Sequence, residues 1–472
     1  MKNIIALTVF FLNLFLSAQV TTDNLKVKLD SLTSSSFFDT AAVSIDVFDL
    51  TTNNTLYQKN NKLLLHPASN MKVLTTATAL FFLGKDFAFE TSLYYDGFII
   101  DSTLYGNLYF VGGCDPDFTT ADLRVLVSSI KDLGLNRIQG NIYGDVSMLD
   151  SLFWGDGWMW NDDPSTDFPY LTPLTINDNA VKVCVFPTEI DGKPNVTLEP
   201  NCTFFKIENK ATTVSNRRTS LEITRDFVHR KNDIILKGFI NQSDSVYSDE
   251  INVVYPEKYF LTLAKEEIEK LGISFIGNIE ISNLPEEVKH LLTFKRKFAD
   301  VINHLNKQSD NLSAEMTLRA LALKFYGKPA TAENGVRLID SLITIAGMNP
   351  RNYRIVDGSG VSHYNLVSTE LLNAVLKYFY LQQPELYKTL SQSFPLAGVD
   401  GTLRRRMKNT LAENNLRAKT GTISGVSSLS GYVTTKSKHQ LSFSLMIQNH
   451  VRKTYRAVYF LDQICSLLSE LD

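Results

Sequence analysis

Residues His66-Pro67-Ala68-Ser69-Asn70-Met71-Lys72 begin an apolar segment whose composition predicts a helix from Ser69 to Leu83, ended by Gly84. At spacing i, i+3 the hydroxyl of Ser69 and the amine of Lys72 lie on the same helix face, one turn apart. The amine can then take the hydroxyl proton, which is the first requirement of a serine nucleophile.

A Ser-x-x-Lys pattern is weak evidence when it stands alone. Serine at a helix start is also a common N-cap. Ser128 and Lys131 repeat the same spacing in this chain by chance. The catalytic interpretation therefore needs support from other motifs.

Two further motifs follow in a fixed order. Ser309-Asp310-Asn311 lies in a polar loop before a predicted helix, and Lys419-Thr420-Gly421-Thr422 ends a predicted strand. Without the other motifs, Ser309-Asp310-Asn311 would be interpreted as an N-cap and turn cluster, and Lys419-Thr420-Gly421-Thr422 as a solvated strand end. In this order, the three motifs resemble the set found in class A β-lactamases and penicillin-binding proteins.

Three longer tracts extend the resemblance: Gly155–Trp160 (GDGWMW), Asp357–Gly360 (DGSG) and Pro395–Arg404 (PLAGVDGTLR). With them, essentially the whole mature chain resembles the DacB-type D-alanyl-D-alanine carboxypeptidase/endopeptidases, the class C low-molecular-mass penicillin-binding proteins. The resemblance implies a serine β-lactamase/DD-peptidase (transpeptidase-like) core with a β-rich, two-part insertion between the first two motifs.

Hydrophobic patterning independently favours an α+β fold. Strands are predicted at 416–420, 428–435 and 440–448, followed by an amphipathic helix over 451–471, and the first strand and helix are expected to join this core. The predicted ranges are a signal peptide at 1–18, a catalytic domain at 19–88 and 290–472, an inserted β-rich domain at 89–104 and 172–289, and a second inserted domain at 105–171.

The resemblance implies acyl transfer from a D-Ala-D-Ala peptide through a serine ester. Ser69 is the predicted nucleophile and Lys72 the predicted base. Repulsion from nearby Lys419 is expected to lower the pKa of Lys72, and burial acts in the same direction. Ser309 is predicted to relay the proton to the leaving amine, and Asn311 to orient Lys72 and the substrate amide.

The Lys-Thr-Gly strand is expected to bind the substrate. Lys419, Thr420 and Thr422 are predicted to hold its terminal carboxylate, while Gly421 avoids a side chain that would crowd the space behind the strand. The backbone N–H groups of Ser69 and Thr422 are predicted to form the oxyanion hole.

Composition excludes several other classes of function. The 47 Lys and Arg against 50 Asp and Glu leave no basic excess for binding nucleic acid. No metal-binding His motif and no glycine-rich nucleotide loop occurs in a suitable context, so neither a metal nor another cofactor is predicted. The family resemblance implies peptidoglycan stem peptides as substrates and β-lactams as covalent inhibitors.

The N-terminus predicts export. Lys2 precedes an apolar run from Ile4 to Leu16, too short to span a bilayer, and Ala18 is a plausible cleavage point. The mature protein is therefore expected to be periplasmic or secreted, without a transmembrane segment. Export permits disulfides, so Cys184 and Cys202 could be bridged or could remain buried thiols.

Two alternatives and one ambiguity remain open. A β-lactamase of class A uses a glutamate with Asn four residues later, and none of the candidates has it: Glu315, Glu333, Glu370, Glu385 and Glu413. A non-catalytic cell-wall-binding protein would keep the fold without the reaction. Carboxypeptidase activity on the terminal D-alanine and endopeptidase activity on the D-Ala–diaminopimelate cross-link use the same residues.

Overall fold

The computed structural model describes residues 20–451 and 454–472, so the predicted signal peptide lies outside the described residues. The core contains one five-stranded sheet in the order β19-β20-β21-β1-β2, in which every neighbouring pair is antiparallel. Its strands are β1 (Ala42–Asp49), β2 (Asn54–Lys59), β19 (Arg417–Ile423), β20 (Val426–Thr434) and β21 (Gln440–Gln448). The N-terminal strands thus join the C-terminal ones, and the predicted α+β core is confirmed.

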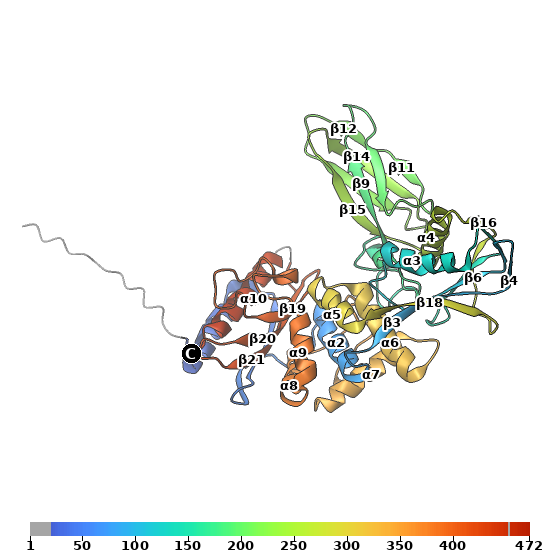
Figure 1. Cartoon of the computed structure of the whole chain (residues 1–472). Coiled ribbons are helices and arrows are strands. Elements are labelled where there is room, and N and C mark those ends of the chain that lie inside the picture. The colour runs from blue at the N-terminus through green and yellow to red at the C-terminus, as the bar shows by residue number, and fades with distance from the viewer. Residues whose placement is uncertain (1–19, 452–453) are drawn as a thin grey trace, which may run out of the picture.

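Helices cover both faces of this sheet (Figure 1). Residues of β1 alternate between the two faces of the sheet. Ile45 and Val47 belong to the hydrophobic cluster on one face, and Phe48 belongs to the cluster on the other. The first layer comprises α1 (Thr22–Thr33) and α10 (Thr454–Ser469). The second comprises α2 (Met71–Phe82), α5 (Phe298–Lys307), α6 (Asn311–Tyr326), α7 (Ala332–Ile345), α8 (Thr369–Gln382) and α9 (Pro384–Ser393).

The chain between α2 and α5 forms the insertion. Its part nearest the core has a five-stranded sheet, β17-β8-β6-β3-β18, and a four-stranded sheet, β16-β7-β5-β4. The elements are β3 (Ala88–Tyr95), β4 (Phe98–Ile100), β5 (Thr103–Tyr105), β6 (Leu108–Val111), α3 (Thr120–Ser128), β7 (Arg137–Gln139), β8 (Ile142–Asp145), α4 (Pro256–Lys270), β16 (Ser274–Ile276), β17 (Ile279–Ile281) and β18 (Lys289–Lys297).

A second part of the insertion projects away from the core, at the top of Figure 1. It has a three-stranded sheet, β10-β9-β15, and a sheet in which β11, β12 and β13 all pair with β14. The strands are β9 (Ala180–Phe186), β10 (Asn195–Glu199), β11 (Ile207–Asn209), β12 (Thr212–Val214), β13 (Ser220–Arg225), β14 (Ile234–Asn241) and β15 (Tyr247–Asn252). One hydrophobic cluster runs through both parts of the insertion.

Strand pairing joins segments that the predicted domain ranges separate. Most of β3 lies in the predicted β-rich domain (89–104), but it pairs with β6 of the second predicted domain (105–171). β18, which was assigned almost entirely to the catalytic domain, pairs with β3 rather than with the core sheet. The side-chain pattern of a strand indicates which face is buried but not which distant strand it pairs with. The domain limits remain a prediction.

Two element boundaries differ from the sequence-based prediction near the motifs. Ser69 lies in a 3₁₀ turn (Ala68–Asn70) that precedes α2, and β19 continues through Gly421 and Thr422 to Ile423. Both motifs are therefore held by regular backbone.

The four cysteines are free and buried, so Cys184 and Cys202 are not bridged. Burial raises the pKa of the Cys202 thiol to about 12, which makes it an unreactive group. Within residues 20–451 and 454–472, no helix has the length and apolar character needed to cross a membrane.

Candidate active site

The predicted nucleophile lies on a tight turn at the start of the central helix. Ala68 has a positive φ of 46°, a conformation that L-residues rarely adopt. Ala68 and Asn70 are buried, while Ser69 is half-buried and lines a cleft. Gly360 approaches so closely that a Cβ there would lie 2.0 Å from the carbonyl oxygen of Ala68. The turn therefore presents the serine hydroxyl to the cleft from a closely packed backbone.

Lys72 is completely buried directly below this hydroxyl. Its Nζ lies 2.9 Å from Ser69 Oγ, 2.5 Å from Asn311 Oδ1 and 2.9 Å from the carbonyl oxygen of Ser359. These are three acceptors for the three N–H groups of an ammonium. The amine is therefore fixed in direct contact with the hydroxyl.

Burial lowers the pKa of Lys72 to about 8, although four surrounding carboxylates act in the opposite direction. Repulsion from Lys419 was expected from the sequence to be the main cause of this lowered pKa, whereas burial is the largest cause here. Repulsion between the two lysines instead contributes to the lowered pKa of Lys419, after burial. The difference arises because α2 and its neighbours enclose Lys72 completely, which no spacing in the sequence reveals.

Ser309 and Lys419 form a second serine–lysine pair. Lys419 is also completely buried, and its Nζ donates to Ser309 Oγ and to the Thr420 carbonyl oxygen, each at 2.8 Å. Ser309 has a positive φ of 65°, immediately before the N-cap of α6. Lys419 therefore lies beneath the cleft and contacts it through Ser309.

Asn311 connects the first pair to the insertion. Its Oδ1 accepts from Lys72, and its Nδ2 donates to the carbonyl oxygen of Asp167 at 2.6 Å. Because both ends of the amide are bonded, its orientation is determined by two elements far apart in the sequence.

Strand β19 forms one wall of the cleft. Thr420 and Thr422 line it, and Thr420 Oγ1 lies 2.7 Å from Thr402 Oγ1. Gly421 faces the other way, where a Cβ would lie 2.3 Å from Ser428 Oγ and 2.8 Å from the Pro67 carbonyl oxygen. Glycine is needed there because the strand packs directly on the turn that carries the nucleophile.

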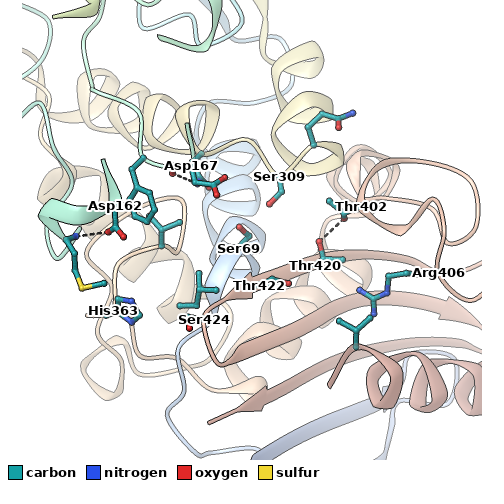
Figure 2. A pocket seen from close by; sticks show the side chains of 17 residues that line it. Ser69, Asp162, Asp167, Ser309, His363, Thr402, Arg406, Thr420, Thr422 and Ser424 are labelled. Atoms are coloured by element: carbon teal, nitrogen blue, oxygen red, sulfur yellow. Dashed lines mark hydrogen bonds between the residues drawn. The ribbon is translucent and has the colours of Figure 1, made fainter. Parts of the chain in front are cut away.

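The cleft has a volume of about 620 Å³, with Ser69, Ser309 and Asn311 on its lining. Figure 2 shows Ser69, Ser309, Thr420 and Thr422 converging at its centre. The insertion and two core loops add residues that the sequence did not single out as site residues: Met159, Asp162, Asp167, Phe168, His363, Thr402 and Arg406. From the sequence, the tract from Trp158 to Asp163 in the insertion could be interpreted either as reaching the peptide substrate or as core and turn packing.

Within that tract the side chains divide between cleft and core. Met159 and Asp162 line the cleft, whereas Trp158 is buried and its Nε1 donates to Asp357 Oδ2 at 3.1 Å. The tract thus contributes side chains both to the cleft lining and to the core, and its contact with the peptide substrate remains a prediction.

A buried carboxylate supports Lys72 from behind. Glu315 Oε1 accepts from the backbone N–H groups of Gly358 and Ser359, both at 2.9 Å, and its other oxygen pairs with Arg319. These bonds aim the Ser359 carbonyl oxygen at Lys72. Glu315 is completely buried, so it is not placed to activate a water in the cleft as a β-lactamase glutamate would be.

The predicted oxyanion-hole donors border the same cleft. Ser69 and Thr422 both line it, one from the turn before α2 and the other from β19. The role of their N–H groups remains a prediction, as do the roles of the other site residues.

One group of potential metal ligands lies near this region in the described part of the chain: Asp117, Asp178 and His304. His304 Nδ1 is 2.7 Å from Asp117 Oδ1, and this hydrogen bond raises the pKa of His304 to about 9. The imidazole therefore carries both protons at neutral pH and pairs with Asp117 as a cation.

Known proteins share this sequence and architecture. The family model of the D-Ala-D-Ala carboxypeptidase 3 (S13) family matches residues 25–466. The chain is 28% identical over 409 residues to D-alanyl-D-alanine carboxypeptidase DacB of Haemophilus influenzae, covering 84% of this chain and 83% of that protein. It is 27% identical over 443 residues to a D-alanyl-D-alanine carboxypeptidase of Actinomadura sp. strain R39, covering 90% and 81%.

A solved structure extends the similarity to three dimensions. The crystal structure of penicillin binding protein 4 (dacB) from Haemophilus influenzae superposes with a TM-score of 0.82 at 25% identity, covering 93% of this chain and 99% of that one. A second structure of that protein is a complex with a β-lactam. With a family model matching nearly its whole length, the chain belongs to the D-Ala-D-Ala carboxypeptidase 3 (S13) family of serine-type peptidases.

Proposed function

We propose that this member of the D-Ala-D-Ala carboxypeptidase family hydrolyses the terminal D-Ala-D-Ala bond of peptidoglycan stem peptides through an acyl-enzyme on Ser69. The observation that carries the proposal is the 2.9 Å contact between Lys72 Nζ and Ser69 Oγ at the centre of the cleft. A pKa of about 8 leaves part of the amine neutral near pH 7, so Lys72 can accept the proton.

Acylation begins when the neutral Lys72 amine removes the proton from Ser69 Oγ. The oxygen attacks the carbonyl carbon of the penultimate D-alanine and forms a tetrahedral oxyanion, which the N–H groups of Ser69 and Thr422 stabilise. Collapse of this intermediate breaks the C–N bond and leaves an ester on Ser69. Water then hydrolyses the ester and regenerates the serine.

The second serine–lysine pair serves the leaving group. Ser309 Oγ lines the cleft and contacts Lys419, so it can pass a proton to the departing amine. The hydroxyls of Thr420 and Thr422 bind the terminal carboxylate. A carboxylate at this position raises the pKa of Lys419 toward its ordinary value, and the charged Lys419 then keeps Lys72 neutral by repulsion.

β-Lactams are proposed as covalent inhibitors that acylate the same serine. Support comes from the Haemophilus protein, which has been solved in complex with a β-lactam. A penicillin adduct mapped by mass spectrometry to a peptide without Ser69 would contradict this assignment.

We further propose endopeptidase activity on the D-Ala–diaminopimelate cross-link. The same acylation residues serve both bonds, and the cleft is bordered by insertion residues that can contact a longer leaving group. Purified cross-linked peptidoglycan is expected to lose dimeric muropeptides and to gain monomers. If D-alanine is released while the dimers persist, the enzyme is a carboxypeptidase alone.

The pH dependence follows from the pKa of Lys72. The base must be neutral, and below pH 8 its neutral fraction falls about tenfold for each pH unit. We therefore expect kcat/KM for a pentapeptide to rise with pH and to level off near pH 8, because the peptide carboxylate does not titrate in this range. A profile that is flat or falls from pH ~6 to ~8 would exclude Lys72 as the base.

A further inference from the structure

The residues 162–168, here called the cleft loop, join the insertion to the catalytic centre. Asp162, Asp167 and Phe168 line the cleft. The carbonyl oxygen of Asp167 also accepts a hydrogen bond from Asn311, the residue that contacts Lys72. The conformation of the cleft loop thus determines one of the two bonds that orient the Asn311 amide.

The cleft loop contains no strand and only the last residue of a 3₁₀ turn (Trp160–Asp162), and one residue of β15 connects it to that strand. Asn252, the last residue of β15, is 1% exposed. Its Nδ2 donates to the carbonyl oxygens of Ser165 at 3.1 Å and Phe168 at 2.8 Å, and its backbone N–H donates to Pro164 at 3.1 Å. One asparagine therefore holds both the middle and the end of the loop.

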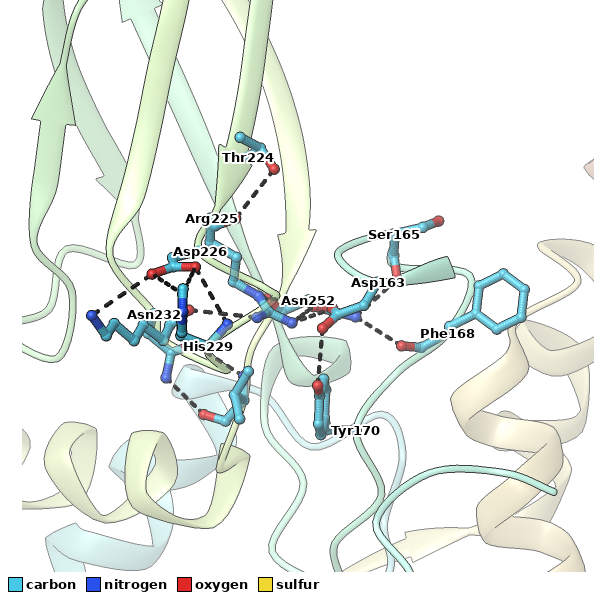
Figure 3. A network of polar contacts seen from close by, with 12 residues as sticks. Asp163, Ser165, Phe168, Tyr170, Thr224, Arg225, Asp226, His229, Asn232 and Asn252 are labelled. Atoms are coloured by element: carbon cyan, nitrogen blue, oxygen red, sulfur yellow. Dashed lines mark hydrogen bonds and ion pairs between the residues drawn. The ribbon is translucent and has the colours of Figure 1, made fainter. Parts of the chain in front are cut away.

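Arg225, the last residue of β13, fixes that asparagine and the start of the loop. Its buried guanidinium forms an ion pair with the carboxylate of Asp163 and donates to Asn252 Oδ1 at 2.7 Å. Tyr170 Oη donates to the other oxygen of Asp163 at 2.9 Å. Figure 3 shows this network between the strands of the projecting part and the cleft loop.

The network is better suited to positioning than to stability. Burying an ion pair removes two charges from water. The attraction between the charges often does no more than offset this desolvation cost. A fully bonded buried network does, however, impose a single arrangement on the groups it connects. Here the network connects β13 and β15 to the cleft loop, and the cleft loop in turn bonds to Asn311.

We infer that Asn252 and Arg225 are positioning residues of the reaction: through the cleft loop they orient Asn311, and so Lys72, for acylation. The inference rests on the proposed function for its kinetic consequence. It gives the projecting β-rich part of the insertion a role in turnover, although none of its strands supplies a residue to the cleft.

Asn252→Asp tests the contact with a minimal change. The retained oxygen still accepts from Arg225, while the oxygen that replaces Nδ2 faces the carbonyls of Ser165 and Phe168 and repels them. The matched control is Asn232→Asp. Asn232 bonds to the backbone of Val254 through both amide atoms, at 2.8 and 3.0 Å, and within the described residues it forms no hydrogen bond with the cleft loop.

We expect Asn252→Asp to lower kcat/KM for a D-Ala-D-Ala peptide about tenfold or more, mainly through kcat, because a small misplacement of a reacting group costs up to about 100-fold. Asn232→Asp is expected to stay within about twofold of the wild type. A purely structural role of Asn252 would lower the melting temperature and leave kcat per folded molecule unchanged, which would overturn the inference.

Hydrogen–deuterium exchange of the amides in residues 162–168 provides a readout that does not require activity. Faster exchange in Asn252→Asp than in Asn232→Asp is expected, and equal exchange would overturn the inference. Asn252→Ser, which is too short to reach the loop carbonyls, replaces Asn252→Asp if that variant does not fold. A wild-type protein that released no D-alanine would refute the proposed function, while the exchange comparison would still decide whether Asn252 holds the loop.

Discussion

Ser69→Ala is expected to abolish both D-alanine release and covalent labelling by penicillin, with kcat/KM falling about 10⁴-fold or more. Alanine leaves Lys72 in place but removes the oxygen that forms the ester. Ser309, the other cleft serine next to a lysine, is assigned to the leaving group in the proposed mechanism and is not expected to replace Ser69 as the nucleophile. Pentapeptide hydrolysis and a fluorescent penicillin measure the two losses.

Ser128→Ala is the matched control for this substitution. Ser128 and Lys131 have the same spacing as Ser69 and Lys72, but Ser128 is exposed and its hydroxyl donates to the carbonyl oxygen of Val125. This variant should keep wild-type activity. Unchanged D-alanine release by Ser69→Ala would exclude Ser69 as the nucleophile and favour a site elsewhere in the cleft.

Lys72→Met is expected to have the second largest effect, a loss of about 10²- to 10⁴-fold in the rate of acylation. Methionine fills a similar space but cannot accept the Ser69 proton. The substitution removes a buried cation and the free-energy cost of its desolvation, so the variant should remain folded. Asn311 Oδ1 and the Ser359 carbonyl oxygen each lose a hydrogen-bond donor. Stopped-flow labelling with a fluorescent penicillin measures the rate directly.

Two comparisons make the Lys72 result specific. Lys131→Met changes the exposed lysine of the chance motif and should acylate at the wild-type rate. The pH dependence of acylation below pH 8 should disappear in Lys72→Met, since the titrating base has been removed. If Lys72→Met acylates as fast as the wild type, another group activates Ser69.

The motif elements were predictable because each depends on local chemistry. An apolar segment ended by Gly84 marked the central helix, and hydrophobic patterning marked β20 and β21, whose observed bounds lie within two residues of the prediction at each end. Spacing alone placed Ser69 and Lys72 on one helix face. The family resemblance then supplied the order of the motifs and the insertion between them.

Other features had no local signal. The partners of β3 lie at residues 108–111 and 289–297, and strand pairing over such separations depends on tertiary packing. The contact of Asn252 with the cleft loop spans more than 80 positions. An asparagine at a strand end is ordinary in sequence, so nothing marked it as a residue of interest.

By itself, the sequence determined which chemical groups this protein offers and on which elements they stand, because residue type and the helical or strand repeat act over a few positions. Only the tertiary structure decided what those groups do to one another. It buried Lys72 so that desolvation, more than repulsion, lowers its pKa, and it brought the Asp167 carbonyl to Asn311. Burial and long-range hydrogen bonds are properties of the packed chain, since they depend on which distant segments exclude water from a group.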